Sequence, residues 1–163
     1  MVLRECASVG KIRGRNITDY KREMIDKLHN YASRKASLEF TARELERLNA
    51  EMTRIQSSMK DEAPVRGGEN HTEDRLVNLI MKKCEIEAIR RETEAWVLNL
   101  ERALAALDAD ERHIIEVMCI DQVRGAAEQL CVEFGEVDER TIYRRRNRAL
   151  RHLTVMYYGA VER

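Results

Sequence analysis

Apolar side chains recur at gaps of three and four residues along two long stretches of the chain. The first repeat shifts phase once, between Leu45 and Leu48. It comprises Met24, Leu28, Tyr31, Lys35, Leu38, Ala42, Leu45, Leu48, Met52, Ile55 and Met59. The second comprises Leu76, Leu79, Lys83, Ile86, Arg90, Thr93, Val97, Leu100, Leu104 and Leu107. This spacing is typical of a coiled-coil seam, so each stretch predicts a long amphipathic helix.

The segment between the two repeats interrupts the helical pattern. It contains the one proline of the chain, Pro64, and the pair Gly67-Gly68. Proline cannot continue a helix, and paired glycines give the backbone the freedom to reverse. We therefore expect a linker over about residues 60–72 within an antiparallel helical hairpin. Because the apolar stripe of this hairpin is thin and includes charged residues, we also expect the hairpin to form a homo-oligomer.

Three shorter helices are predicted after the hairpin. Asp108 is placed to accept hydrogen bonds from the free amides of the first, expected at about residues 110–119, and Glu111 completes a capping box. The second helix ends before Gly135, which favours a C-terminal stop, and Asp138 caps the third. Two helices joined by a tight, glycine-containing turn have the geometry of a helix-turn-helix.

The predicted fold is thus all-α. Charged residues make up 36% of the chain and aromatic residues 5%, which agrees with long helices that are largely exposed to solvent. The expected organisation is a flexible basic arm over residues 1–16, the helical hairpin over 17–107, the helix-turn-helix domain over 108–156 and a tail over 157–163.

The last helix concentrates positive charge in a chain whose formal net charge is zero. Its apolar residues Ile142, Ala149, Leu150 and Leu153 recur at helical spacing and are expected to face inward. The helix dipole favours cations in the last turns, but it does not account for the arginines near the middle of the helix. The pattern therefore favours DNA binding over an incidental basic surface. The arginines are Arg140, Arg144, Arg145, Arg146, Arg148 and Arg151.

The N-terminal end of this helix is expected to enter the major groove of double-stranded DNA. An arginine there can pair with guanine, and a carboxylate can accept a hydrogen bond from cytosine. Arginines farther along the helix or on its flanks are expected to bind phosphates. The candidates for base reading are Glu139, Arg140, Thr141, Tyr143 and Arg144, and those for phosphate binding are Arg145, Arg146, Arg148 and Arg151.

Several function classes do not fit the sequence. The four cysteines form no CxxC pair and the four histidines are scattered, so we expect no metal site and no cofactor. A glycine-rich phosphate loop and a nucleophile elbow are both missing, so we do not expect an enzyme. No apolar run reaches the roughly 20 residues of a membrane span, and the N-terminus lacks the apolar core of a signal peptide. We therefore expect a cytoplasmic protein without membrane partners.

The segment from Leu107 to Leu153 resembles region 4 of sigma-70-type factors. The resemblance rests on Asp-Glu-Arg112 at the start of one helix and on Thr-Ile-Tyr-Arg…Arg-Ala-Leu-Arg-His-Leu153 in the last. In that family the helix-turn-helix reads the −35 promoter element. By position, the resemblance implies base-reading roles for Glu139, Arg140, Tyr143 and Arg144.

The whole layout is similar to the ArpU/RinA-like phage regulators of late transcription, over about residues 20–155. These proteins also join a charged helical hairpin, an Arg-Gly-Gly linker (here Arg66-Gly67-Gly68) and a sigma-like helix-turn-helix. The resemblance implies an activator of late packaging, morphogenesis or lysis genes. It also implies a bacterial RNA polymerase as a partner and the cytoplasm of a bacterial host as the location.

Two other classes remain open at this point. The small subunit of a phage terminase also joins a helix-turn-helix to a helical oligomerisation hairpin, but it recognises a packaging site and assembles into rings. The second class is a protein that binds other proteins through the coiled-coil hairpin and whose basic helix is incidental. Its partner binding would not change when Arg140 and Arg144 are replaced.

Overall fold

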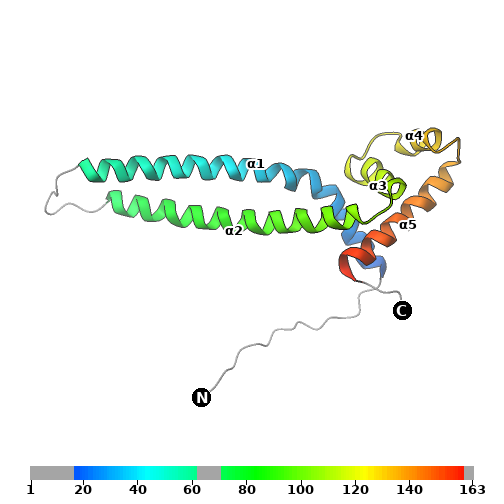
Figure 1. Ribbon diagram of the computed structural model, residues 1–163, viewed down its shortest axis with the longest axis horizontal. Coiled ribbons are helices and arrows are strands. Elements are labelled where there is room, and N and C mark those ends of the chain that lie inside the picture. The colour runs from blue at the N-terminus through cyan, green and yellow to red at the C-terminus, as the bar shows by residue number, and fades with distance from the viewer. Residues whose placement is uncertain (1–16, 62–70, 160–163) are drawn as a thin grey trace, which may run out of the picture. The chain divides into compact units, whose positions relative to one another are not determined.

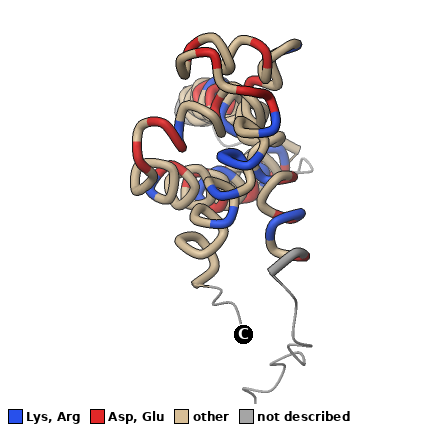
Figure 2. The backbone as a smooth tube through the Cα atoms, turned by 90° about the vertical axis from the view of Figure 1, so that its right-hand side faces the viewer, with Lys and Arg blue, Asp and Glu red and all other residues tan. Residues whose placement is uncertain are grey.

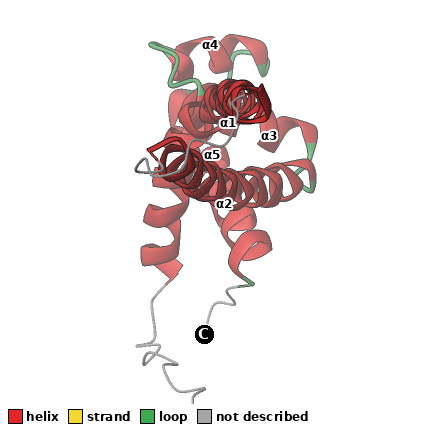
Figure 3. Ribbon diagram, turned by 90° about the vertical axis from the view of Figure 1, so that its left-hand side faces the viewer, coloured by secondary structure: helices red, strands yellow, loops and turns green. Residues whose placement is uncertain are grey.

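The computed structural model describes residues 17–61 and 71–159, and within them it is helical with no strand (Figures 1 and 3). This confirms the predicted all-α class. The predicted basic arm, residues 62–70 of the linker and residues 160–163 of the tail lie outside the described residues. The elements in chain order are α1 (Ile17–Asp61), α2 (His71–Ala105), α3 (Ala109–Ile115), the π-helical turn η1 (Glu116–Ile120), α4 (Ala126–Glu133) and α5 (Glu139–Tyr158).

The chain divides into two compact units, and the division falls inside helices rather than at a loop. Of the described residues, the first unit comprises 17–29 and 103–159, and the second comprises 30–61 and 71–102. The first turns of α1 therefore belong with the C-terminal helices, while the rest of α1 belongs with most of α2.

In the second unit, α1 and α2 run antiparallel (Figure 1). Ion pairs along the two helices follow this direction, because partners later in α1 pair with partners earlier in α2. Buried Leu48, Ile55, Val97 and Leu100 lie along the seam. The pairs across it are Lys35 with Glu101 at 2.7 Å, Lys82 with Glu44 at 3.0 Å and Arg75 with Glu51 at 2.6 Å.

The seam between α1 and α2 includes polar side chains, as the sequence pattern predicted. The Nζ of Lys35 donates hydrogen bonds to Glu101 and to the Tyr31 hydroxyl, which in turn donates to Glu101 at 2.7 Å. The guanidinium of Arg34 lies 4.5 Å from the centre of the Trp96 ring. Hydrogen bonds and ring contacts thus accompany the buried Val97 and Leu100 at this end of the second unit.

The first unit has the more apolar core. One cluster joins α3, η1, α4 and α5 through Ile114, Val117, Ala126, Leu130 and Ile142, all buried. Full burial of a leucine or isoleucine side chain contributes about 1.5–3 kcal/mol relative to leaving it exposed. Packing of this cluster is therefore the main force that holds the short helices together, since helices of this length are marginal on their own.

The first turns of α1 complete the first unit. Met24 and Leu28 are fully buried. The ring of Tyr20 lies 5.0 Å from that of Tyr158, centre to centre, and Lys27 Nζ lies 5.4 Å from the centre of the Tyr157 ring. Tyr157 and Tyr158, which the sequence analysis assigned to a tail, form the last turn of α5 and are half-buried.

Two of the predicted helix caps are confirmed. Asp108 accepts a hydrogen bond from the Glu111 amide at 2.8 Å, and Asp138 accepts one from the Thr141 amide at 2.6 Å. Gly135 follows α4 with a φ of 86°, a left-handed conformation that glycine adopts without strain. The turn between α4 and α5 is therefore fixed by local backbone chemistry.

The predicted capping box at α3 is wrong in its second half. The Glu111 carboxylate does not return to the start of its own helix, because it faces α5 and binds Arg148 and His152 there. The helix expected at about residues 110–119 also differs, since its second half is the π-helical turn η1. This turn is closed by the Asp121 amide, which donates to the Glu116 carbonyl at 2.8 Å.

Candidate nucleic-acid interface

Helix α5 has an apolar face and a basic face. Ile142, Ala149, Leu150 and Leu153 are buried, which confirms the predicted inner face. Arg140, Arg144, Asn147, Arg148 and Arg151 are exposed. Over the described residues, basic and acidic residues are interspersed (Figure 2). A helix face with this many exposed arginines is therefore a local electrostatic feature of α5.

The predicted base-reading residues lie together in the first two turns of α5. Glu139, Arg140, Tyr143 and Arg144 are exposed, whereas Thr141 is half-buried. A half-buried threonine has less reach toward a base edge than its neighbours. The accessible part of the predicted set is thus one carboxylate, one phenol and two guanidinium groups.

The N-terminus of α5 is held in place by Asp138. Hydrogen bonds from Thr141 are the main cause of a lowered pKa for this carboxyl group, and the charges of Arg140 and Arg144 lower it further. Asp138 is therefore a carboxylate near neutral pH and keeps its cap on the helix. The cap fixes the residue at which α5 begins, and so the positions of the exposed side chains in its first turn.

The predicted phosphate-binding arginines have different surroundings. The Arg145 guanidinium lies 5.0 Å from the centre of the Phe134 ring of the preceding turn. Arg146 is half-buried, and its Nε has no hydrogen-bond partner among the described residues. The Nε of Arg148 lies 3.2 Å from Glu111, whereas Arg151 is exposed on the basic face. Arg145 and Arg148 are thus partly engaged within the protein.

The buried carboxylate of Glu111 contacts the basic helix α5. Glu111 is 4% exposed, and its side chain lies 3.2 Å from Arg148 Nε and 3.0 Å from His152 Nδ1. These contacts tie α3 to the middle of α5. Sequence reasoning missed this role because the spacing of Asp108 and Glu111 indicated a helix cap instead.

The turn before α5 and the start of α4 both use left-handed backbone. Gly135 and Glu136 have φ values of 86° and 57° in succession, and the Val137 amide donates to the Cys131 carbonyl at 3.2 Å. At the other end of α4, Gly125 has a φ of 76° at the N-cap and no side chain caps the helix. The orientation of α4 between its neighbours thus depends on these two glycines.

A cavity of about 400 Å³ lies between the start of α4 and α5. Its walls include Gly125 and Glu128 from the α4 side and Glu139, Tyr143 and Arg146 from α5. Two of the predicted base-reading residues therefore stand beside a hollow rather than on a flat surface. The mixture of carboxylates and one guanidinium gives this hollow no single sign of charge.

Two other kinds of feature, metal clusters and membrane spans, were sought among the residues that the structure describes. There, no three His, Cys, Asp or Glu side chains come together that could hold a metal ion. None of the described helices is long and apolar enough to cross a membrane. Cys84, Cys119 and Cys131 are free thiols.

Comparison with known proteins places the chain in a family. A family model described as a protein of unknown function (DUF1492) matches residues 54–154. No curated protein and no solved structure matches the chain. The matched segment includes α2, α3, η1 and α4, together with most of α5, and it makes up more than half of the 163 residues. The chain therefore belongs to the DUF1492 family.

Proposed function

We propose that this protein is a sequence-specific DNA-binding transcriptional regulator that uses α4 and α5 as a helix-turn-helix. The main supporting observation is the exposed arginine face of α5, which lies opposite a fully buried apolar face. A helix with that division of faces can enter the major groove without uncovering the core of its own domain.

The proposed roles of the arginines follow from their positions. Arg140 and Arg144 are one turn apart at the N-terminal end, where a docked recognition helix comes closest to base edges. Glu139 adds an acceptor at the same end. Arg148 and Arg151 are one and two turns farther along, where contacts to the sugar-phosphate backbone position the protein. Base reading is thus assigned to the first turns and phosphate binding to the later ones.

We further propose a biological role as a phage-type activator of late genes that acts with the host RNA polymerase. This finer assignment rests on the similarity to region 4 of sigma factors and to the ArpU/RinA-like regulators. In that role the hairpin of α1 and α2 would set the oligomeric state or bind a second protein, while the C-terminal helices select the DNA site.

The experiment that tests the DNA-binding function is a selection from a random duplex library with the full-length protein at physiological salt. The wild type should enrich a defined motif, and Arg144→Ala should lose it at one or two positions, at a cost of about 1–3 kcal/mol. Arg43→Ala is the matched control, because Arg43 is an exposed arginine on α1 in the second unit. It should enrich the same motif as the wild type.

Three outcomes would lead to different conclusions. A motif that is unchanged in Arg144→Ala would show that the proposed face is wrong. Binding without any enriched motif would contradict sequence-specific recognition. A motif that maps to a packaging site, together with a ring-sized particle in solution, would favour a small terminase subunit over a transcriptional regulator.

A further inference from the structure

Helix α2 has a second apolar repeat that α1 does not cover. The repeat, here called the outer seam, follows gaps of four and three over about three heptads. Val77, Met81 and Leu98 are 52%, 66% and 46% exposed, and the other members are exposed as well. The outer seam consists of Val77, Met81, Cys84, Ala88, Arg91, Ala95 and Leu98. Its one charged member is Arg91, whose Nε donates to the Glu87 carbonyl of the same helix at 3.3 Å.

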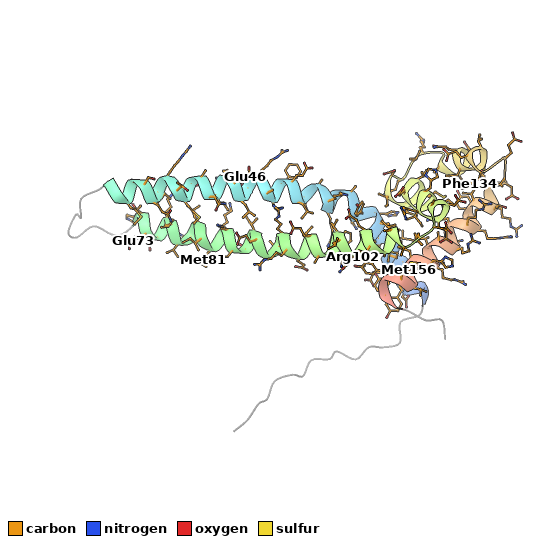
Figure 4. All side chains as sticks on the ribbon, viewed as in Figure 1. Glu46, Glu73, Met81, Arg102, Phe134 and Met156 are labelled. Carbon is orange, nitrogen blue, oxygen red and sulfur yellow. The ribbon has the colours of Figure 1, made fainter. Side chains whose placement is uncertain are left out.

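The outer seam lies on the face of α2 opposite to the one that packs on α1. Leu79 and Ile86 belong to the repeat of α2 that packs on α1, here called the inner repeat, and both are half-buried. Met81 projects on the side of α2 away from α1 (Figure 4). A helix with a single apolar face buries that face against one neighbour. A helix with apolar residues on two opposite faces needs a neighbour on each face to bury them. The outer seam therefore has the pattern of an interface for another helix.

Glutamates flank the outer seam on both sides at heptad spacing. Glu87 and Glu94 lie on one flank and are paired within the helix, with Lys83 at 3.8 Å and Arg90 at 2.7 Å. On the other flank, Glu85 and Glu92 have neither an ion pair nor a hydrogen bond among the described side chains.

These flanks decide against a second copy of α2 as the occupant. In a parallel pair Glu87 would face Glu92 of the other copy. In an antiparallel pair each flank would face itself, which again places glutamate against glutamate. Like charges at these positions oppose pairing, and opposite charges select the partner. We infer that the outer seam binds an amphipathic helix of a different protein, one that flanks its apolar seam with lysine or arginine.

The inference can be tested with designed helical peptides and the full-length protein. The probe is a labelled peptide of about three heptads with Ile and Leu at its seam positions and Lys at its flanks, which cannot pair with itself. A matched peptide has Glu at the flanks and the same seam. Fluorescence anisotropy should show binding of the Lys-flanked peptide at least about tenfold tighter than binding of the Glu-flanked one.

Three variants separate docking at the outer seam from general charge attraction. Met81→Lys should weaken binding of the Lys-flanked peptide about tenfold or more, since it places a charge in the seam. Phe40→Lys is the control, because Phe40 is 67% exposed on α1 and is outside the outer seam. Replacing Glu85 and Glu92 together by Lys should shift the preference toward the Glu-flanked peptide. Circular dichroism checks that each variant keeps its helix content.

Three results would overturn the inference. Equal binding of the two peptides, or no binding of either, would show that the flanking charges select nothing. An equal effect of the Met81 and Phe40 variants would place the contact elsewhere. A dimer of the protein alone that dissociates in Met81→Lys, seen by analytical ultracentrifugation, would assign the outer seam to a second copy. None of these measurements involves DNA, so they stand apart from the test of the proposed function.

Discussion

Replacing Glu111 or its partner Arg148 tests whether the buried carboxylate holds the basic helix in place. The two perturbations differ in what they leave behind. Glu111→Gln removes the negative charge and leaves Arg148 and His152, whose side chains are 61% and 47% exposed. Arg148→Met removes a cation and leaves a carboxylate whose side chain is 5% exposed. Water can therefore solvate Arg148 and His152 in Glu111→Gln, but it cannot reach the Glu111 carboxylate in Arg148→Met.

The magnitudes follow from this asymmetry. A hydrogen bond to a charged group contributes about 1.5–3 kcal/mol, and the exposure of Arg148 and His152 reduces the loss on Glu111→Gln to about 1–2 kcal/mol. Leaving a buried charge without a partner costs about 3–5 kcal/mol. Because His152 still faces the carboxylate, we expect Arg148→Met to cost about 2–4 kcal/mol. The variant of the more exposed residue should thus be the less stable one.

The assay is urea unfolding followed by circular dichroism, without DNA, on the wild type, both single variants and the double variant. The double variant should lose less free energy of unfolding than the sum of the single variants, because they remove the same interaction. If Arg148→Met were as stable as the wild type, or if the two losses simply added, Glu111 would not be the anchor of α5. The slope of the free energy of unfolding against urea concentration must be the same for all variants before their free energies are compared.

Two further predictions concern the turn and the hairpin. Gly135→Ala should lower the free energy of unfolding by about 1 kcal/mol through backbone strain alone, because a Cβ there would meet no atom within 4 Å. An unchanged free energy in urea unfolding would contradict this. In the hairpin, hydrogen bonds from Arg47 and Lys82 lower the pKa of Glu44 from its usual 4.5 to about 2. Because the pKa is lower in the folded state, the interactions of the Glu44 carboxylate stabilise the fold fully above about pH 4.5. This contribution is lost as the pH falls toward 2. Acid unfolding of Glu44→Gln should therefore depend less on pH over this range than that of the wild type, while the control Glu46→Gln should match the wild type.

The parts of the fold that follow local spacing were predictable from the sequence. The caps by Asp108 and Asp138, the stop at Gly135 and the inner face of α5 each depend on residues within a few positions of one another. The same spacing rules predicted the repeats along which α1 and α2 pack on each other. Local chemistry therefore defined the starts of α3 and α5, the stop after α4 and the apolar face of α5.

Features that depend on distant contacts were not predictable in this way. Glu111 meets Arg148 and His152 at separations of 37 and 41 residues, and its spacing from Asp108 indicated a cap instead. The contact between Tyr20 and Tyr158 joins nearly the two ends of the described chain. The outer seam of α2 was missed for another reason. Two apolar repeats share one helix, and the inner repeat accounts for the pattern on its own.

The π-helical turn η1 has a consequence for how proteins of this kind can diversify. A π-turn contains one residue more than the α-helix needs, and each added or removed residue rotates the following chain by about 100° around the helix axis. Val117 and Cys119 in this turn are buried, so the extra residue is accommodated inside the core rather than looped out. A relative that gains or loses one residue here would change the direction in which the connection over residues 121–125 leaves η1, without a substitution in α5. Under the proposed function, variation in the length of this turn is a separate route to new DNA-site preferences, alongside changes in the exposed side chains.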